Sequence, residues 1–167
     1  MSQQAPQSQV EETPEVAARR DHALAIMTHK VPYLSRMGFV FAREGSELSA
    51  RMPYHADLIG NPMLPALHGG AIAAFLEMTA LMHLSWERIW PDETAPLSPH
   101  GCPVAPKIID LTVDYMRSGR PEDVFGAGRV SRAGRRFATV HSEVWQDDPA
   151  RPIAQAVCHF LMPRRDG

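Results

Sequence analysis

The chain has 167 residues, of which 44% are hydrophobic and 22% charged, values that are ordinary for one globular domain with its own core. Its formal net charge of -2 gives no electrostatic basis for nucleic acid as the main partner. The longest apolar stretch is interrupted by Glu77, Thr79 and His83, so it is too short and too polar to span a membrane.

The N-terminal segment and the cysteines indicate the compartment. Residues 1–14 lack the basic and apolar regions of a signal peptide, and their Gln, Pro and Glu content is typical of a disordered tail. Cys102 and Cys158 have no metal-type spacing, and the eight histidines form no His-x-x-x-His pair, so no metal site is predicted. We therefore expect a reduced cytoplasmic protein, with a single disulfide as the alternative.

The first half of the chain contains two predicted helices. An apolar face predicts a helix from Pro14 to about Lys30, and Val31-Pro32 ends it. Two strands follow, at 38–43 and 47–53, and then a loop rich in turn residues. A second, longer helix is predicted over 70–86.

Strands dominate the second half. The segment 91–106 contains five prolines and is predicted to be an irregular, functional loop. After it, apolar residues alternate with Asp110, Thr112 and Asp114, which predicts a half-buried strand whose inward residues are Ile109, Leu111, Val113 and Tyr115. Hairpin turns separate three further strands, at 123–131, 135–146 and 153–162.

This order of elements indicates the fold class. One domain over 15–165 would contain a helix, two strands, a long helix and four strands. The long helix is apolar on most faces and therefore has to be surrounded, which an antiparallel sheet curled around it would achieve. The predicted fold class is α+β.

Glu77 is the one carboxylate in this apolar helix. A carboxylate that is buried without partners is unfavourable, or it shifts its pKa to stay neutral. The residues leave two interpretations open. In the first, Glu77 has a structural role, on a solvent-facing stripe of the helix or in a buried polar network. In the second, it acts as general base or nucleophile in a hydrolysis.

The sequence His68-Gly69-Gly70 precedes the same helix. The glycines could simply permit tight packing, with His68 bonded to the backbone at the loop corner. Alternatively, the first amides of the helix, which have no acceptor within it, could stabilise an oxyanion, and His68 could orient the loop or the substrate. Gly69 and Glu77 are eight residues apart, about 12 Å along a helix, so a site that uses both needs two chains.

Three stretches, in this order, resemble the hotdog-fold acyl-CoA thioesterases of the phenylacetate-pathway type. They are HGGAIAAFLEMTA, IIDLTVDYMRSG, and GRVSRAGRRFATVHSEVWQDD followed by IAQAVCHFLM. The resemblance covers 38–162. Members often carry Asp where this chain has Glu77, whereas the related 4-hydroxybenzoyl-CoA thioesterases use Glu there. Family members often have Asn six residues before the His, and here Asn61 is seven before it.

The resemblance implies a hotdog fold, hydrolysis of acyl-CoA without a cofactor, and active sites at the interface of a homodimer or a dimer of dimers. It also implies that helix N-terminal Gly amides hold the oxyanion and that Glu77 acts from the partner chain. Asn61 is a turn residue or a group that positions water or the thioester. Four arginines at turns are either a solvated surface or, as a group, ligands for the CoA phosphates: Arg117, Arg132, Arg135 and Arg136.

Three other functions remain open from the sequence. The chain could be a non-catalytic hotdog protein that binds acyl-CoA, or a hydratase or dehydratase on the same fold, which would need a His and an acid at one site. It could also be a structural oligomer without a ligand. Neither nucleic acid nor a membrane is an expected partner.

Overall fold

The computed structural model describes residues 12–164, so most of the predicted disordered tail lies outside the described residues. The helices are α1 (Pro14–Lys30), α2 (Pro32–Met37) and α3 (Gly69–Leu84), with a short 3-10 helix at Ala56–Leu58 and a π-helical turn at Ser85–Ile89. The strands are β1 (Val40–Glu44), β2 (Glu47–Met52), β3 (Ile59–Asn61), β4 (Ala66–Leu67), β5 (Lys107–Tyr115), β6 (Val124–Ala133), β7 (Phe137–Trp145) and β8 (Ala154–Leu161).

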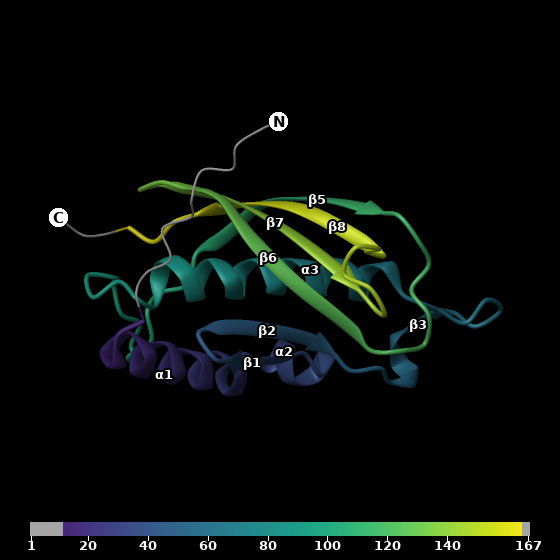
Figure 1. The fold of residues 1–167 in the computed structure, drawn as a ribbon, viewed down its shortest axis with the longest axis horizontal. Coiled ribbons are helices and arrows are strands. Elements are labelled where there is room, and N and C mark those ends of the chain that lie inside the picture. The colour runs from purple at the N-terminus through teal and green to yellow at the C-terminus, as the bar shows by residue number, and fades with distance from the viewer. Residues whose placement is uncertain (1–11, 165–167) are drawn as a thin grey trace.

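Six strands form one antiparallel sheet that curves over α3 (Figure 1). Their order is β1-β2-β6-β7-β8-β5, so β5 is an edge strand, while β3 and β4 pair separately. The helices α1 and α2 lie beside β1 and β2, on the side of α3 away from β5, β7 and β8 (Figure 1), and α1 packs against β1. The predicted α+β fold, with a curved sheet wrapped around one long helix, is confirmed.

The core forms around α3 because this helix is apolar on nearly every side. Ten of its 16 residues are buried, and they contact β6, β7 and β8. Two glycines of β6 allow the sheet to approach the helix closely. A Cβ atom at Gly126 would lie 3.0 Å from Thr79 Oγ1, and one at Gly128 would lie 2.8 Å from His83 Cβ. The sheet therefore follows the helix surface at a distance that larger residues would not permit.

A hydrogen-bonded cluster attaches α1 to the end of α3. Arg20 is buried; its Nε donates to the carbonyl oxygen of Trp86 at 3.0 Å, and its Nη1 donates to Glu12 at 2.9 Å. The guanidinium groups of Arg20 and Arg43 both lie over the Trp86 ring, at 4.8 and 5.2 Å from its centroid. Because a buried cation needs both a counter-ion and hydrogen bonds, this cluster fixes the π-helical turn relative to α1.

Three local features differ from the prediction. The helix α2, the β3–β4 pair and the π-helical turn were all expected to be loop or regular helix, since each is too short for a periodic pattern.

In β5, a bulge at Ile109 shifts the register, so Ile108 faces inward and Ile109 is 55% exposed. The prediction that Ile109 faces the core was therefore wrong. Cys102 and Cys158 are both buried and do not form a disulfide.

Replacing Gly128 with Ala tests the close contact between β6 and α3. The added methyl group has no room beside Cβ and Cγ of His83. We therefore expect the free energy of unfolding to fall by about 1–3 kcal/mol in urea denaturation. Gly134→Ala is the matched control, because its added methyl would meet its nearest atom, the Phe137 carbonyl oxygen, at 3.5 Å. Equal losses in the two variants would contradict this account of the packing.

Candidate functional site

At the N-terminus of α3, one backbone amide has no partner in the described part of the chain. The His68 side chain is the N-cap, and its Nδ1 accepts a hydrogen bond from the Gly70 amide at 2.9 Å. The amides of Ala71 and Ile72 donate to the His68 carbonyl oxygen. Among residues 12–164, no acceptor is found for the Gly69 amide. Of the two glycine amides, Gly69 therefore remains available to bind an oxyanion at the positive end of the helix.

Tyr115, at the end of β5, holds this glycine and was not predicted to be a functional residue. Its hydroxyl donates to the Gly69 carbonyl oxygen at 2.7 Å, and its ring lies 3.4 Å from where a Gly69 Cβ would be. The one signal in the sequence is the position of Tyr115 at the end of the alternating strand. Its contact with a residue 46 positions away depends on the tertiary structure.

Glu77 occupies the middle of α3 and is only half-buried. Burial raises the pKa of its carboxyl group above the ordinary value. No hydrogen bond or salt bridge to Glu77 is found in the part of the chain that the structure describes. Among these residues, Glu77 is therefore not part of a buried polar network. Its half-burial agrees with the other interpretation, in which it lies on a solvent-facing stripe of the helix.

Glu77 lies near Cys158 of β8, close enough for its charge to act on the thiol. Burial is the main cause that raises the pKa of Cys158 on β8 to about 11, and the negative charges of Glu77 and Asp110 raise it further. The inward residues of β5 are only half-buried, because no other element of the chain covers them fully: Ile108, Leu111 and Val113. Glu77 thus lies on the side of α3 near β8, the strand that pairs with β5.

The two polar groups that follow Glu77 in α3 point elsewhere. His83 is buried against β6, and its Nδ1 is 2.8 Å from the carbonyl oxygen of Thr79. Burial lowers the pKa of His83, so its neutral form is favoured. No hydrogen bond joins Glu77 to a histidine within residues 12–164, so the His–acid pair of a hydratase is not found there.

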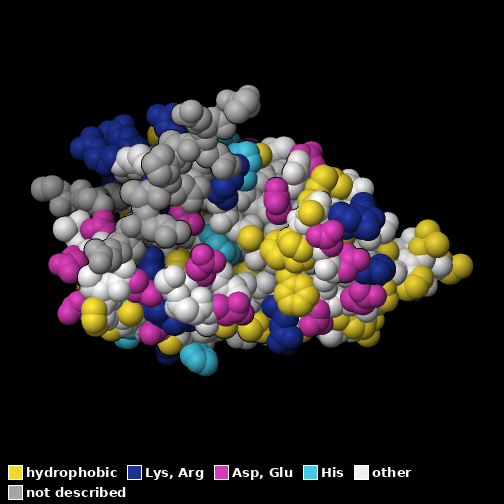
Figure 2. Space-filling model, viewed as in Figure 1, with side chains coloured by type: hydrophobic (Ala, Val, Ile, Leu, Met, Phe, Trp, Pro, Cys, Tyr) yellow, Lys and Arg dark blue, Asp and Glu magenta, His cyan; other side chains and the backbone are white. Residues whose placement is uncertain are grey.

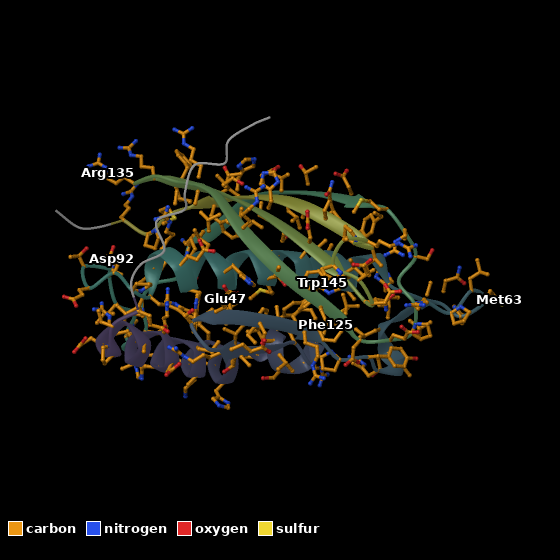
Figure 3. The ribbon with its side chains drawn as sticks, in the orientation of Figure 1. Glu47, Met63, Asp92, Phe125, Arg135 and Trp145 are labelled. Atoms are coloured by element: carbon orange, nitrogen blue, oxygen red, sulfur yellow. The ribbon has the colours of Figure 1, made fainter. Side chains whose placement is uncertain are left out.

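Asn61 ends β3 and shapes the turn before β4. Its Oδ1 accepts hydrogen bonds from the amides of Met63 and Leu64 at 3.0 and 3.3 Å. Met63 lies at the tip of this hairpin and points away from the body of the molecule (Figure 3). The observed contacts of Asn61 are those of a turn residue.

The four candidate arginines do not form one group. Lys107 of β5 and Phe137 of β7 both pair with Leu161, so the β6–β7 hairpin lies where β5 begins. This hairpin carries three of them: Arg132, Arg135 and Arg136. Arg117 follows the opposite end of β5, where its side chain donates to the carbonyl oxygens of Arg151 and Pro152. Arg117 therefore lies apart from the other three arginines of the same chain.

The described residues contain neither a candidate metal site nor a helix that could span a membrane. Between residues 12 and 164, no three His, Cys, Asp or Glu side chains come together in a way that could hold a metal ion. None of the helices in this range has the length and apolar character needed to cross a membrane.

Comparison with known proteins gives the family. The family model of the thioesterase superfamily matches residues 64–153. A solved structure from Chromobacterium violaceum is 35% identical, covers 92% of this chain and 100% of its own, and has a TM-score of 0.64. No curated protein matches the chain.

Two more distant structures show the fold alone. The E. coli PaaI protein, from the phenylacetic acid degradation operon, is 11% identical with a TM-score of 0.70, covering 90% of this chain and 97% of its own. A Bacillus halodurans protein solved with CoA is 16% identical with a TM-score of 0.64, covering 93% and 98%. The chain therefore has the hotdog fold and belongs to the thioesterase superfamily.

Proposed function

We propose that this protein hydrolyses acyl-CoA thioesters to a free acid and CoA, at sites that each use two chains. One observation carries the proposal. The helix α3 bears both the Gly69 amide, which has no acceptor among residues 12–164, and, eight residues later, the half-buried carboxylate of Glu77. At a rise of about 1.5 Å per residue, the two groups are about 12 Å apart along the helix, too far to act on one carbonyl.

The proposed mechanism assigns separate tasks to the two chains. The Gly69 amide of one chain holds the thioester oxygen as it becomes negative, and the helix dipole favours that charge. Glu77 of the partner chain takes a proton from water as the water attacks, or it attacks the carbonyl itself and forms an anhydride that water then opens. In both routes the C–S bond breaks, the thiolate of CoA takes up a proton, and no cofactor is needed.

The environment of Glu77 suits a general base. A carboxylate whose pKa is raised by burial binds a proton more strongly than one in water, so it is the better base once it is ionised. Since no cation pairs with it among the described residues, nothing there opposes this effect. His68 has a supporting role in the proposal, because its bond to the Gly70 amide fixes the turn that presents Gly69.

An isologous dimer would bring the two groups together. The edge strand β5 ends beside Gly69 and has unpaired backbone groups along its outer edge. It also exposes large apolar side chains, with Ile109 55% and Tyr115 53% exposed. We propose that β5 lies at this interface, in a homodimer or a dimer of dimers.

Removing the carboxylate should abolish turnover. We expect Glu77→Gln to lower kcat by about 10²–10⁴, measured as thiol release from acyl-CoAs ranging from acetyl to palmitoyl, with phenylacetyl and hydroxybenzoyl included. Glu87→Gln is the matched control, because burial also raises the pKa of Glu87, and its kcat should not change. Full activity of the Glu77 variant would rule out the proposed base. Binding of CoA esters without turnover in the wild type would indicate the non-catalytic protein.

Two inactive variants should complement each other if each site uses two chains. Gly69→Pro removes the amide hydrogen at the first helical position, where proline is tolerated, and His68 already has the extended conformation (φ -65, ψ 127) that precedes proline. When it is mixed and reassembled with Glu77→Gln, each heterodimer has one intact site, so we expect about a quarter of wild-type activity.

Gly69→Ala retains the amide and should keep most of its activity, which controls for effects of the added side chain. Differently tagged chains allow the heterodimer to be purified and its composition verified. Verified heterodimers without activity would exclude the two-chain site.

Tyr115→Phe tests the positioning of Gly69. The ring remains but the hydrogen bond to the Gly69 carbonyl is lost, so we expect kcat to fall about 3–10-fold with little change in KM. Tyr33→Phe, on α2, is the control, because the Tyr33 ring packs on Phe39 and no hydrogen bond from Tyr33 to this glycine is found within residues 12–164. A change in KM alone would show that Tyr115 contacts the substrate instead.

A further inference from the structure

We propose that the tip of the β3–β4 hairpin, Met63 and Leu64, inserts into a cavity of about 400 Å³ on a second copy of this chain. The hairpin immediately precedes α3. The cavity lies at the other end of α3, between the π-helical turn, the 91–106 loop and the β6–β7 hairpin. The inference rests on the dimer proposed above, in which β5 lies at the interface. It adds a second contact between the two chains.

The tip is the most prominent apolar feature of the described surface. Met63 is 87% exposed and Leu64 71%, and no other large hydrophobic residue in 12–164 is as exposed as these two. Figure 2 shows hydrophobic side chains on the projection at the right, where Figure 3 shows Met63 pointing away from the body of the molecule. A single exposed apolar residue is ordinary, but two at the end of a projection are typical of a contact with a partner.

The hairpin holds its tip in a fixed conformation. The side chain of Asn61 accepts hydrogen bonds from the amides of both tip residues. Pro62 and Pro65 enclose the tip and fix their own φ angles. At the base, the His68 amide donates to the Leu58 carbonyl oxygen at 2.7 Å. The two apolar side chains are therefore presented in advance, which lowers the entropy lost on docking.

The cavity suits an apolar occupant. Most of its walls are apolar, formed by residues such as Ile89, Ala95, Pro96 and Met162. The charged groups that line it have both signs, since Asp92 lies there with Arg88 and Arg135, and the negative charge of Glu87 acts on Arg88. These charges partly offset one another, so burial of apolar surface is the main gain that the cavity offers.

The fold places the tip and the cavity at opposite ends of β5. The last residue of β5, Tyr115, bonds to Gly69, which directly follows the hairpin and its N-cap. The first residue, Lys107, pairs with Leu161, and Leu161 is next to the cavity residue Met162. Figure 3 accordingly shows the tip at one end of the molecule and the charged rim of the cavity at the other. The tip of a chain therefore cannot fill the cavity of the same chain.

A two-fold axis at β5 brings the two features together. When two copies of β5 pair about an axis normal to the sheet, they run antiparallel, so Tyr115 of one chain lies beside the start of the partner's β5. The hairpin of each chain then lies at the cavity end of the other. Both tips and both cavities are used, so the assembly closes as a dimer.

Docking of the tip would also support the proposed oxyanion site. A Cβ atom at Gly60 would lie 2.7 Å from the His68 Cα, so β3 packs directly against the N-cap of α3. The His68 Nδ1 in turn accepts the hydrogen bond from the Gly70 amide. A hairpin held by the partner therefore holds the turn that presents the Gly69 amide, and the same partner supplies Glu77.

The experiment measures how fast subunits exchange between dimers of the full-length protein. Met63→Ser with Leu64→Ser removes the apolar tip. Tyr33→Ser with Val40→Ser is the control, because these two apolar residues are also exposed but lie on α2 and on β1, the opposite edge strand. Two cavity variants alter the other side of the contact: Ala95→Trp fills the cavity, and Met162→Glu puts a charge in its wall. Thermal unfolding first establishes which variants are folded.

Exchange is followed by energy transfer after donor-labelled and acceptor-labelled dimers are mixed. We expect it to be at least about tenfold faster in the tip variant than in the wild type, and unchanged in the control. Each folded cavity variant should show the same acceleration. Combining the tip variant with Ala95→Trp should add no further acceleration, because both remove one contact. The tip substitutions are at exposed positions, so that variant decides the question even if a cavity variant does not fold.

Exchange at the wild-type rate in the tip variant, or in a folded cavity variant, would overturn the proposal, as would a wild type that is monomeric. Thiol release from acyl-CoAs is measured on the same samples. Active dimers with unchanged exchange would remove only the docking contact and leave the proposed function. Faster exchange in the variants of a protein that hydrolyses no thioester would leave the contact and remove the proposed function.

Discussion

The structure depends on the burial of one helix that is apolar on nearly every side. Its ten buried residues cannot be covered by a flat surface, so the six-stranded sheet has to curve around them. The glycines of β6 permit this, because Gly126 and Gly128 bring the strand against Thr79 and His83. Once the sheet is in place, the only acidic residue of α3, Glu77, is half-buried and lies near Cys158 of β8.

The same helix positions the groups that the proposed reaction needs. Its first amide is available because His68 occupies the second glycine amide and the Tyr115 hydroxyl holds the Gly69 carbonyl. The rigid spacing along a regular helix then prevents Gly69 and Glu77 of one chain from acting together. A closed two-fold assembly would solve this problem without moving either group, since it supplies each from a different copy.

The two ends of α3 have different surroundings. At the N-terminal end, β5 and the β3–β4 hairpin surround a backbone amide. At the other end, Arg88 of the π-helical turn, Arg135 of the hairpin and the Asp92 carboxylate line one cavity. The buried Arg20, paired with Glu12 and lying on Trp86, attaches that second end to α1.

The sequence by itself determined the elements whose pattern is local and long. Periodicity predicted α1, α3 and the six strands of the sheet, and an acid within an apolar helix identified Glu77, because both signals depend only on neighbouring residues. The tertiary structure alone decided features that depend on pairing across the chain. The bulge at Ile109 changed which side chains of β5 face inward, and strand register separated Arg117 from the hairpin arginines. The contact of Tyr115 with Gly69 spans 46 residues, and no local pattern carries information about such a contact.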